Sequence, residues 1–133
     1  MIAIDTSALM AIANHEPERS RFLEIIAAAD HCLISAVTIL EVRIVTFGRY
    51  GAAGTDRLAE WLATFAPEFV AFDGAQAHAA FAAFKTYGKG INPKARLNFG
   101  NCASYALAKS RNVPLLFKGD DFAATDIVAA FSA

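Results

Sequence analysis

Four short apolar segments alternate with longer segments whose apolar residues recur at helical spacing, and this alternation limits the fold more than any other feature. The expected strands are Met1–Ile4, His31–Ile34, Glu68–Phe72 and Pro114–Phe117. Strands buried on both faces are nearly continuous apolar runs, and helical connections join parallel strands. We therefore expect a three-layer α/β/α fold with a central parallel sheet of four to five strands.

The segments between these strands favour helices. The expected helices are Thr6–Asn14, Pro17–Ala29, Ala36–Tyr50, Asp56–Phe65, Ala75–Tyr87 and Asn98–Arg111. Gly51 and Gly88 follow two of them, at the position where glycine commonly ends a helix. A loop is expected over Gly88–Leu97, and the apolar stretch Ile127–Phe131 closes the chain.

The length of the chain and the shortness of its apolar runs predict a single domain without a membrane-spanning segment. We expect a single domain over residues 1–133, because this length is sufficient for a real core and no linker or repeat divides it. No apolar run approaches the ~18 residues of a membrane span. Met1 leads directly into an apolar strand without the basic region of a signal peptide. These features predict a cytoplasmic protein.

Cysteine and histidine are placed in a way that argues against a disulfide and a zinc site. Cys32 and Cys102 lie far apart in apolar surroundings, so buried thiols in a reducing compartment are expected. The three histidines, His15, His31 and His78, show no ligand spacing.

The net charge of −1 hides an asymmetry along the chain. All 13 acidic residues lie outside Gly74–Gly119, while this segment holds seven of the 12 basic residues. They are Lys85, Lys89, Lys94, Arg96, Lys109, Arg111 and Lys118. Such a chain can bind a polyanion with one part and a cation with another, although a solvated helix surface explains the charges equally well.

Acidic residues follow two of the expected strands. Asp5 comes directly after the first, and Asp120 and Asp121 follow the fourth. In doubly wound folds, ligands bind outside the carboxyl ends of the strands. Each residue also has an ordinary structural explanation, as a helix N-cap for Asp5 and as turn residues for the pair.

Glu41 is the most informative acid, because its helical neighbours Val37, Ile44 and Val45 are apolar. A carboxylate on a buried apolar face must be paired, protonated or bound to a metal. A salt bridge to Arg43 or Arg49 is the alternative to a site role for Glu41.

Carboxylates that converge from several segments are neutralised by a cation, and a set of ligands that are all oxygens favours Mg²⁺ or Mn²⁺ over zinc. Such clusters support phosphodiester hydrolysis and phosphoryl transfer alike.

Five groups of residues, in order and at matching spacing, resemble VapC-type toxins of the PIN-domain family. They are Ile2–Leu9, Ile34–Ala36 leading to Glu41, Tyr87–Gly90, Leu97–Gly100 before Ala106–Lys109, and Leu115–Phe122. The resemblance runs from residue 2 to about Ile127, which is nearly the whole chain. It implies a PIN fold and a Mg²⁺- or Mn²⁺-dependent endoribonuclease. It also implies the toxin half of a type II toxin–antitoxin pair, homodimeric, and bound by a VapB-type antitoxin whose tail enters the acidic cleft.

The resemblance also assigns roles to residues. It implies that Asp5 is the first metal-binding acid, that Glu41 is the second acid, and that the hydroxyl of Thr6 or Ser7 orients a ligand or water. The fourth acid is Asp120 or Asp121, because Gly119 stands where many family members carry it.

The third acid is replaced by asparagine. Family members with the Leu-Asn-Phe-Gly motif continue with Asp-Cys, and here Asn101 precedes Cys102. Asparagine keeps one carbonyl oxygen but loses the charge that holds a hard cation, so we expect weakened catalysis. An engineered substitution and a naturally weakened protein both fit. The structural alternative is that Asn101 is the N3 residue of a helix capped by Asn98.

Basic residues lie on and beside the expected Gly/Pro loop, Gly88–Leu97. We expect Lys85, Lys89, Lys94 and Arg96 to steer RNA phosphates toward the metal.

The main alternative function is that of a catalytically inactive PIN-like module that binds antitoxin or RNA. A phosphatase-like protein lacks support, since no Asp-x-Asp follows the first strand, and no GxGxxG supports a dinucleotide enzyme.

Overall fold

The four strands of the sheet all run parallel. In the computed structural model, which describes residues 1–131, they are β1 (Ile2–Ile4), β2 (Cys32–Ser35), β3 (Glu68–Val70) and β4 (Leu115–Leu116). Their order is β3-β2-β1-β4, so β1 lies inside the sheet between β2 and β4. The expected central parallel sheet is confirmed. The final apolar stretch adds an isolated parallel bridge, in which Ala129 pairs with Leu115.

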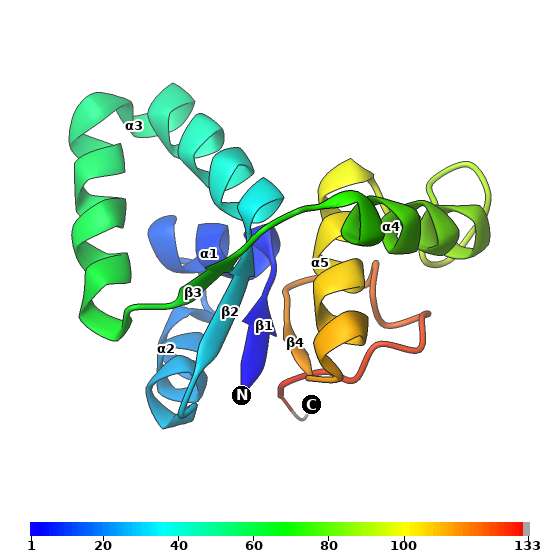
Figure 1. Cartoon of the computed structure of the whole chain (residues 1–133). Helices are drawn as coiled ribbons and strands as arrows, with labels where there is room; N and C mark the ends of the chain where they lie inside the picture. Colours follow the sequence, from blue (N-terminus) through cyan, green and yellow to red (C-terminus); the bar gives the residue numbers. More distant parts are fainter. Residues whose placement is uncertain (132–133) are drawn as a thin grey trace.

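Helices cover both faces of this sheet (Figure 1). α1 (Thr6–Ala13), α2 (Arg19–Ala28) and α3 (Ala36–Phe65) pack on one face, while α4 (Gly74–Tyr87) and α5 (Phe99–Arg111) pack on the other. Within β1, Ile2 and Ile4 enter the first core and Ala3 enters the second, because successive strand residues point to opposite faces. The expected three-layer arrangement is confirmed.

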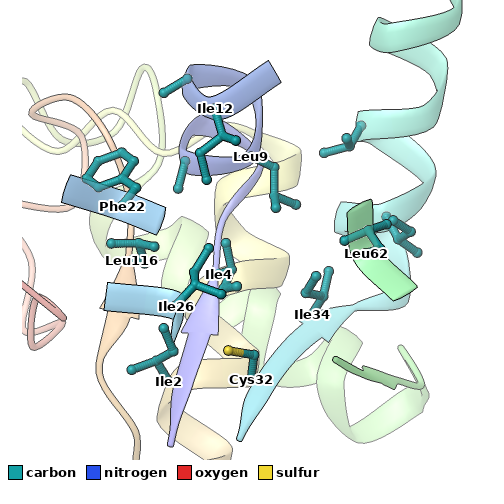
Figure 2. Close-up of a cluster of buried hydrophobic side chains, with 14 of the residues drawn as sticks. Ile2, Ile4, Leu9, Ile12, Phe22, Ile26, Cys32, Ile34, Leu62 and Leu116 are labelled. Carbon is teal, nitrogen blue, oxygen red and sulfur yellow. The ribbon is translucent and has the colours of Figure 1, made fainter. Parts of the chain in front are cut away.

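The core on the α1–α2–α3 side is built from aliphatic side chains that meet over the sheet. Figure 2 shows Ile4, Leu9, Ile34 and Leu116 converging there from β1, α1, β2 and β4. All four are at most 1% exposed, and burying one such side chain contributes about 1.5–3 kcal/mol relative to leaving it in water. This packing holds β1, and therefore the residue that follows it, in a fixed place.

α3 consists of two helical arms that meet at a kink at Gly51, whose φ of 70° lies in the left-handed region. The break at Gly51 agrees with the expected end of the first helix. The second arm begins earlier than the expected Asp56, because Ala52 and Ala53 are strong helix formers. The two arms of α3 form the bend visible in Figure 1.

β3 is shorter than expected, ending at Val70 instead of Phe72. Val70 pairs with Ser35, the last residue of β2. Ser35 is also the N-cap of α3, and its hydroxyl oxygen accepts a hydrogen bond from the Val37 N–H. Since β2 turns into a helix at this point, residues beyond Val70 have no neighbouring strand to pair with.

Cys32 and Cys102 are free and buried, as expected, in the two different cores. No helix within residues 1–131 is long and apolar enough to cross a membrane.

A groove of about 280 Å³ lies between α1 and the two arms of α3. Most of its lining is apolar or aromatic, including Leu9, Ile12 and Trp61. Arg19 and Arg57 also line it, and no acidic residue does.

Candidate functional site

Asp5 occupies the carboxyl end of the central strand β1 and begins α1. It is the N-cap of α1, and its Oδ2 accepts hydrogen bonds from the Ser7 backbone N–H at 3.0 Å and from Ser7 Oγ at 2.7 Å. The N-cap explanation offered by the sequence is therefore correct. The other carboxylate oxygen, Oδ1, faces α5 and accepts a hydrogen bond from Ser104.

The carboxyl group of Asp5 is fully buried, and its environment acts on its ionisation in two directions. Burial raises the pKa of Asp5, since a charged carboxylate loses its hydration there, and hydrogen bonds from Ser104 and Ser7 offset part of this effect. A cation beside the carboxylate would favour its ionised form further.

Two buried hydroxyl groups lie behind Asp5 on the side of α5. Ser104 Oγ donates to Asp5 Oδ1 at 2.6 Å, and it lies 3.2 Å from Thr38 Oγ1 of α3. Ser104 and Thr38 are 1% and 0% exposed. Sequence reasoning missed both residues. The available signal was helical spacing from a predicted site residue, since Thr38 stands three residues before Glu41 and Ser104 three residues after Asn101.

Ser7 joins Asp5 to the turn after β4. Its Oγ donates to Asp5 and accepts a hydrogen bond of 2.9 Å from the backbone N–H of Lys118. The Lys118 ammonium in turn binds Glu16 and Glu18 in the connection between α1 and α2. One serine thus anchors the polar turn to the strand-end acid.

Glu41 lies one turn into α3 and is held by contacts from two other helices. Thr6 Oγ1, at the start of α1, donates a hydrogen bond to Glu41 Oε1. Gly100 of α5 lies so close that a Cβ added there would be 2.5 Å from Oε1. A larger residue at position 100 therefore has no room beside this carboxylate.

Glu41 does not lie on the buried helical face that its apolar neighbours predicted, because Ile44 and Val45 are 62% and 38% exposed. The alternative salt bridge to Arg43 or Arg49 is absent from the ion pairs among residues 1–131. Instead Glu41 faces Thr6 and Gly100, a neighbourhood that helical spacing within α3 does not reveal.

α5 brings the two acids together. Gly100 contacts Glu41 and Ser104 contacts Asp5. Residues four apart lie on the same face of a helix, about one turn or 5.4 Å along its axis. The two carboxylates, 36 positions apart in sequence, therefore face neighbouring turns of one helix.

Asn101 caps α5. Its Oδ1 accepts from the Asn98 backbone N–H at 3.1 Å, while Asn98 Oδ1 accepts from the Asn101 N–H at 2.9 Å, which together form a capping box. The structural explanation for Asn101 is thus correct. The site role of Asn101 stays a prediction, and the residue directly follows Gly100, which contacts the Glu41 carboxylate.

Asp120 and Asp121 lie in the exposed turn after β4. The Asp120 carbonyl accepts from the Ala123 N–H at 3.1 Å, and Gly119 before it has a φ of 100°, as expected for turn residues. No hydrogen bond or ion pair described for residues 1–131 joins either carboxylate to Asp5 or Glu41. Within that part of the chain, no group of three or more His, Cys, Asp or Glu side chains stands ready to hold a metal.

The candidate ligands are all oxygens. Asp5 and Glu41 offer carboxylates beside neighbouring turns of α5, and the amide oxygen of Asn101, one position after Gly100, accepts from the Asn98 N–H. Mg²⁺ and Mn²⁺ take oxygen ligands, and Mg²⁺ is commonly held by one or two carboxylates together with waters and substrate phosphates. The donor chemistry fits such an ion, with less negative charge than a three-acid site would provide.

The four basic residues predicted to bind RNA are exposed on α4 and the loop that follows it: Lys85, Lys89, Lys94 and Arg96. None of them takes part in the ion pairs described for residues 1–131, and Lys85 lies 5.2 Å from the ring centre of Phe81. The loop is closed by a bridge between Gly88 and Leu97.

These features define an α/β protein with two acids at the carboxyl edge of a parallel sheet. The sequence model of the PIN domain matches residues 2–128, and the chain belongs to the PIN-domain family. It is 48% identical over 127 residues to the ribonuclease VapC30 of Mycobacterium tuberculosis, covering 95% of each chain. It is 43% identical to the ribonuclease VapC of Mycolicibacterium smegmatis, covering 96% of this chain and 98% of that one.

Solved structures confirm the fold independently. The M. tuberculosis toxin VapC20, described as cleaving the sarcin–ricin loop, superimposes with a TM-score of 0.78 at 15% identity, covering 96% of this chain and 97% of that one. A chain of a toxin–antitoxin complex from Klebsiella pneumoniae superimposes with a TM-score of 0.74 at 19% identity, covering 100% of both.

Proposed function

We propose that this protein is an endoribonuclease toxin of a type II toxin–antitoxin pair, which hydrolyses RNA phosphodiesters with Mg²⁺ or Mn²⁺. The observation that carries the proposal is that the carboxylates of Asp5 and Glu41 contact neighbouring turns of α5 and that each is held by hydroxyl donors. Relatives at 43–48% identity that are named VapC ribonucleases support the activity. A cytoplasmic location remains a prediction.

The residues of the candidate site would have different roles in this reaction. Asp5 and Glu41 would hold the cation, and Ser7 and Thr6 keep their carboxylates oriented. When bound, the ion supplies an activated water and shields the charge of the phosphate. Asp120 or Asp121 would add negative charge from the turn after β4, provided that the turn approaches the site when ion and substrate bind.

Asn101 should limit this activity. It contributes one neutral oxygen, already accepting from the Asn98 N–H, where the family motif implies a carboxylate. An aspartate at position 101 would keep the capping bond and add a charge near the positive end of α5. Because loss of an outer-sphere partner alone costs about 10–100-fold in metal affinity or activity, a lost ligand charge should cost at least about tenfold.

The decisive experiment compares the wild-type chain with Asn101→Asp and Asp5→Asn. We expect Asn101→Asp to raise both Mn²⁺ affinity and Mn²⁺-dependent RNA cleavage by at least about tenfold. Asp5→Asn should abolish both and still fold, because its amide can donate to Ser104 while its oxygen accepts from Ser7. If Asn101→Asp cleaves RNA no faster than the wild-type chain, Asn101 is not the defect.

An inactive binding module is the alternative, and the asparagine at position 101 favours it. Such a module would bind antitoxin or RNA without a cation. Calorimetry with Mn²⁺ on the wild-type chain separates the two functions, since a module that has lost its metal site shows no heat of binding in the wild-type chain.

An antitoxin partner is supported by the solved complexes that share this fold. We infer that the groove between α1 and α3 receives part of it, as an apolar segment flanked by acidic residues. The apolar lining and the two arginines, Arg19 and Arg57, carry this inference. Co-purification with the product of a small reading frame upstream of the gene is the test, and Arg57→Glu should weaken the complex.

A further inference from the structure

A chain of three side chains runs from α3 through α5 to the end of β1. Thr38 Oγ1 lies 3.2 Å from Ser104 Oγ, and Ser104 Oγ lies 2.6 Å from Asp5 Oδ1. The two hydroxyl residues are fully buried. They are 66 positions apart in sequence and lie on two different helices. No motif of the family resemblance includes either of them.

The direction of the hydrogen bonds follows from the number of protons. An ionised Asp5 carboxylate only accepts, so the single hydroxyl proton of Ser104 must point to Asp5. The oxygen of Ser104 is then free to accept, and the proton between the two hydroxyls must come from Thr38. Thr38 therefore fixes the orientation of Ser104, and Ser104 fixes the orientation of Asp5.

The carboxylate of Asp5 is held at both oxygens by different elements. Ser7 of α1 donates twice to Oδ2, and Ser104 of α5 donates to Oδ1. Without Ser104, the carboxylate would be held at one oxygen and could rotate about its Cβ–Cγ bond. The other oxygen would be buried without its side-chain donor, which is costly for a charged group.

We propose that Ser104 is a positioning residue, supported by Thr38, which presents the Asp5 carboxylate to the divalent cation. The proposal rests on the metal-dependent function proposed above. It assigns to α5 a second part in the site, in addition to the room that Gly100 leaves for Glu41.

Titration of Mn²⁺ alone into the full chain tests this role without depending on catalysis. In both the wild-type and the Asn101→Asp background, Ser104→Ala should raise the Mn²⁺ dissociation constant by about 10–100-fold. Thr38→Val, which keeps the shape of the side chain, should raise it by less. The double variant should bind Mn²⁺ as weakly as Ser104→Ala alone, because Thr38 acts only through Ser104.

Ser110→Ala is the matched control, since Ser110 is an exposed serine of the same helix that contacts Gln76 away from the acids. Its Mn²⁺ affinity should equal that of the parent. A Ser104→Ala chain with parental Mn²⁺ affinity and a lowered urea midpoint in EDTA would show a merely structural serine and overturn the proposal. If Ser104→Ala does not fold, Thr38→Val decides, and unchanged Mn²⁺ affinity in that variant overturns the proposal as well.

Mn²⁺ binding by the parent chains tests the proposed function, and its change in the hydroxyl variants tests the role of Ser104. If neither the wild-type chain nor Asn101→Asp binds Mn²⁺, the metal-dependent function is wrong and the role of Ser104 falls with it. If both bind Mn²⁺ and neither hydroxyl matters, only the positioning role is wrong.

Discussion

Gly100 of α5 leaves the space that the Glu41 carboxylate of α3 occupies. A Cβ at position 100 would lie 2.5 Å and 2.7 Å from the two carboxylate oxygens, far inside van der Waals contact. The absence of a side chain at one residue thus determines where the acid of another helix can stand.

The first prediction concerns this close approach of Gly100 to Glu41. Gly100→Ala should displace Glu41 and reduce Mn²⁺-dependent RNA cleavage, measured in the Asn101→Asp background, by at least about tenfold. Gly48→Ala is the control, because a Cβ there meets nothing within 4 Å. That variant should keep its activity and gain about 0.5–1 kcal/mol in unfolding free energy. Full activity in Gly100→Ala would show that the position of Glu41 does not matter.

The second prediction concerns the basic loop. Lys89 and Lys94 are exposed, so their double reversal to Glu should weaken RNA binding at low salt. The plot of log affinity against log salt concentration should become shallower by about 0.7 for each RNA phosphate that the variant no longer neutralises. The control reverses Arg49 and Arg57, exposed residues of α3, with the same change in net charge. Equal losses in the two double variants would mean that net charge alone, and not this loop, attracts RNA.

The third prediction concerns self-association. Leu40, Ile44 and Phe47 recur at helical spacing on α3 and are 59%, 62% and 61% exposed, which supports the expected homodimer. Ile44→Glu should raise the dimer dissociation constant at least about tenfold in sedimentation experiments, because a charge would be buried there. Phe81→Glu, on α4 and equally exposed at 61%, should leave it unchanged. A wild-type chain that stays monomeric at high concentration would contradict the homodimer itself.

The fourth prediction concerns pH. Asp126 accepts hydrogen bonds from the Tyr105 hydroxyl at 2.6 Å and from the Lys109 ammonium at 2.9 Å. These partners lower the pKa of Asp126 below its ordinary value of 3.8. A carboxyl group with a lowered pKa stabilises the fold above its ordinary pKa, and this contribution is lost as the pH falls through the lowered value.

Asp126→Asn should therefore lower the urea midpoint near neutral pH. The difference from the wild-type chain should shrink once the pH falls below about 3.8, the ordinary pKa of aspartate. Tyr105→Phe, which removes the first of the two donors, should show a smaller effect with the same pH dependence. A difference that is as large at pH 3 as at pH 7 would mean that the charge of Asp126 is not the cause.

The sequence by itself determined the architecture, because apolar runs and helical spacing report directly on what each segment must bury. The apolar run Ile2-Ala3-Ile4 predicted a strand buried on both faces, and in the structure Ile2 and Ile4 enter one core and Ala3 the other. It also placed Asp5 at a strand end, since a residue next to an apolar run can be located without knowing its neighbours in space.

Only the tertiary structure decided what surrounds these acids. Ser104 reaches Asp5 across 99 positions, and Gly100 makes room for Glu41 across a different pair of helices. Spacing within one helix cannot report such contacts, and for Glu41 it suggested a core face that is in fact exposed. The side chain of Asn101 belongs to the capping box of its own helix, as the sequence alternative predicted. Only the packing of α5 beside Asp5 and Glu41 brings this helix end close to the two acids.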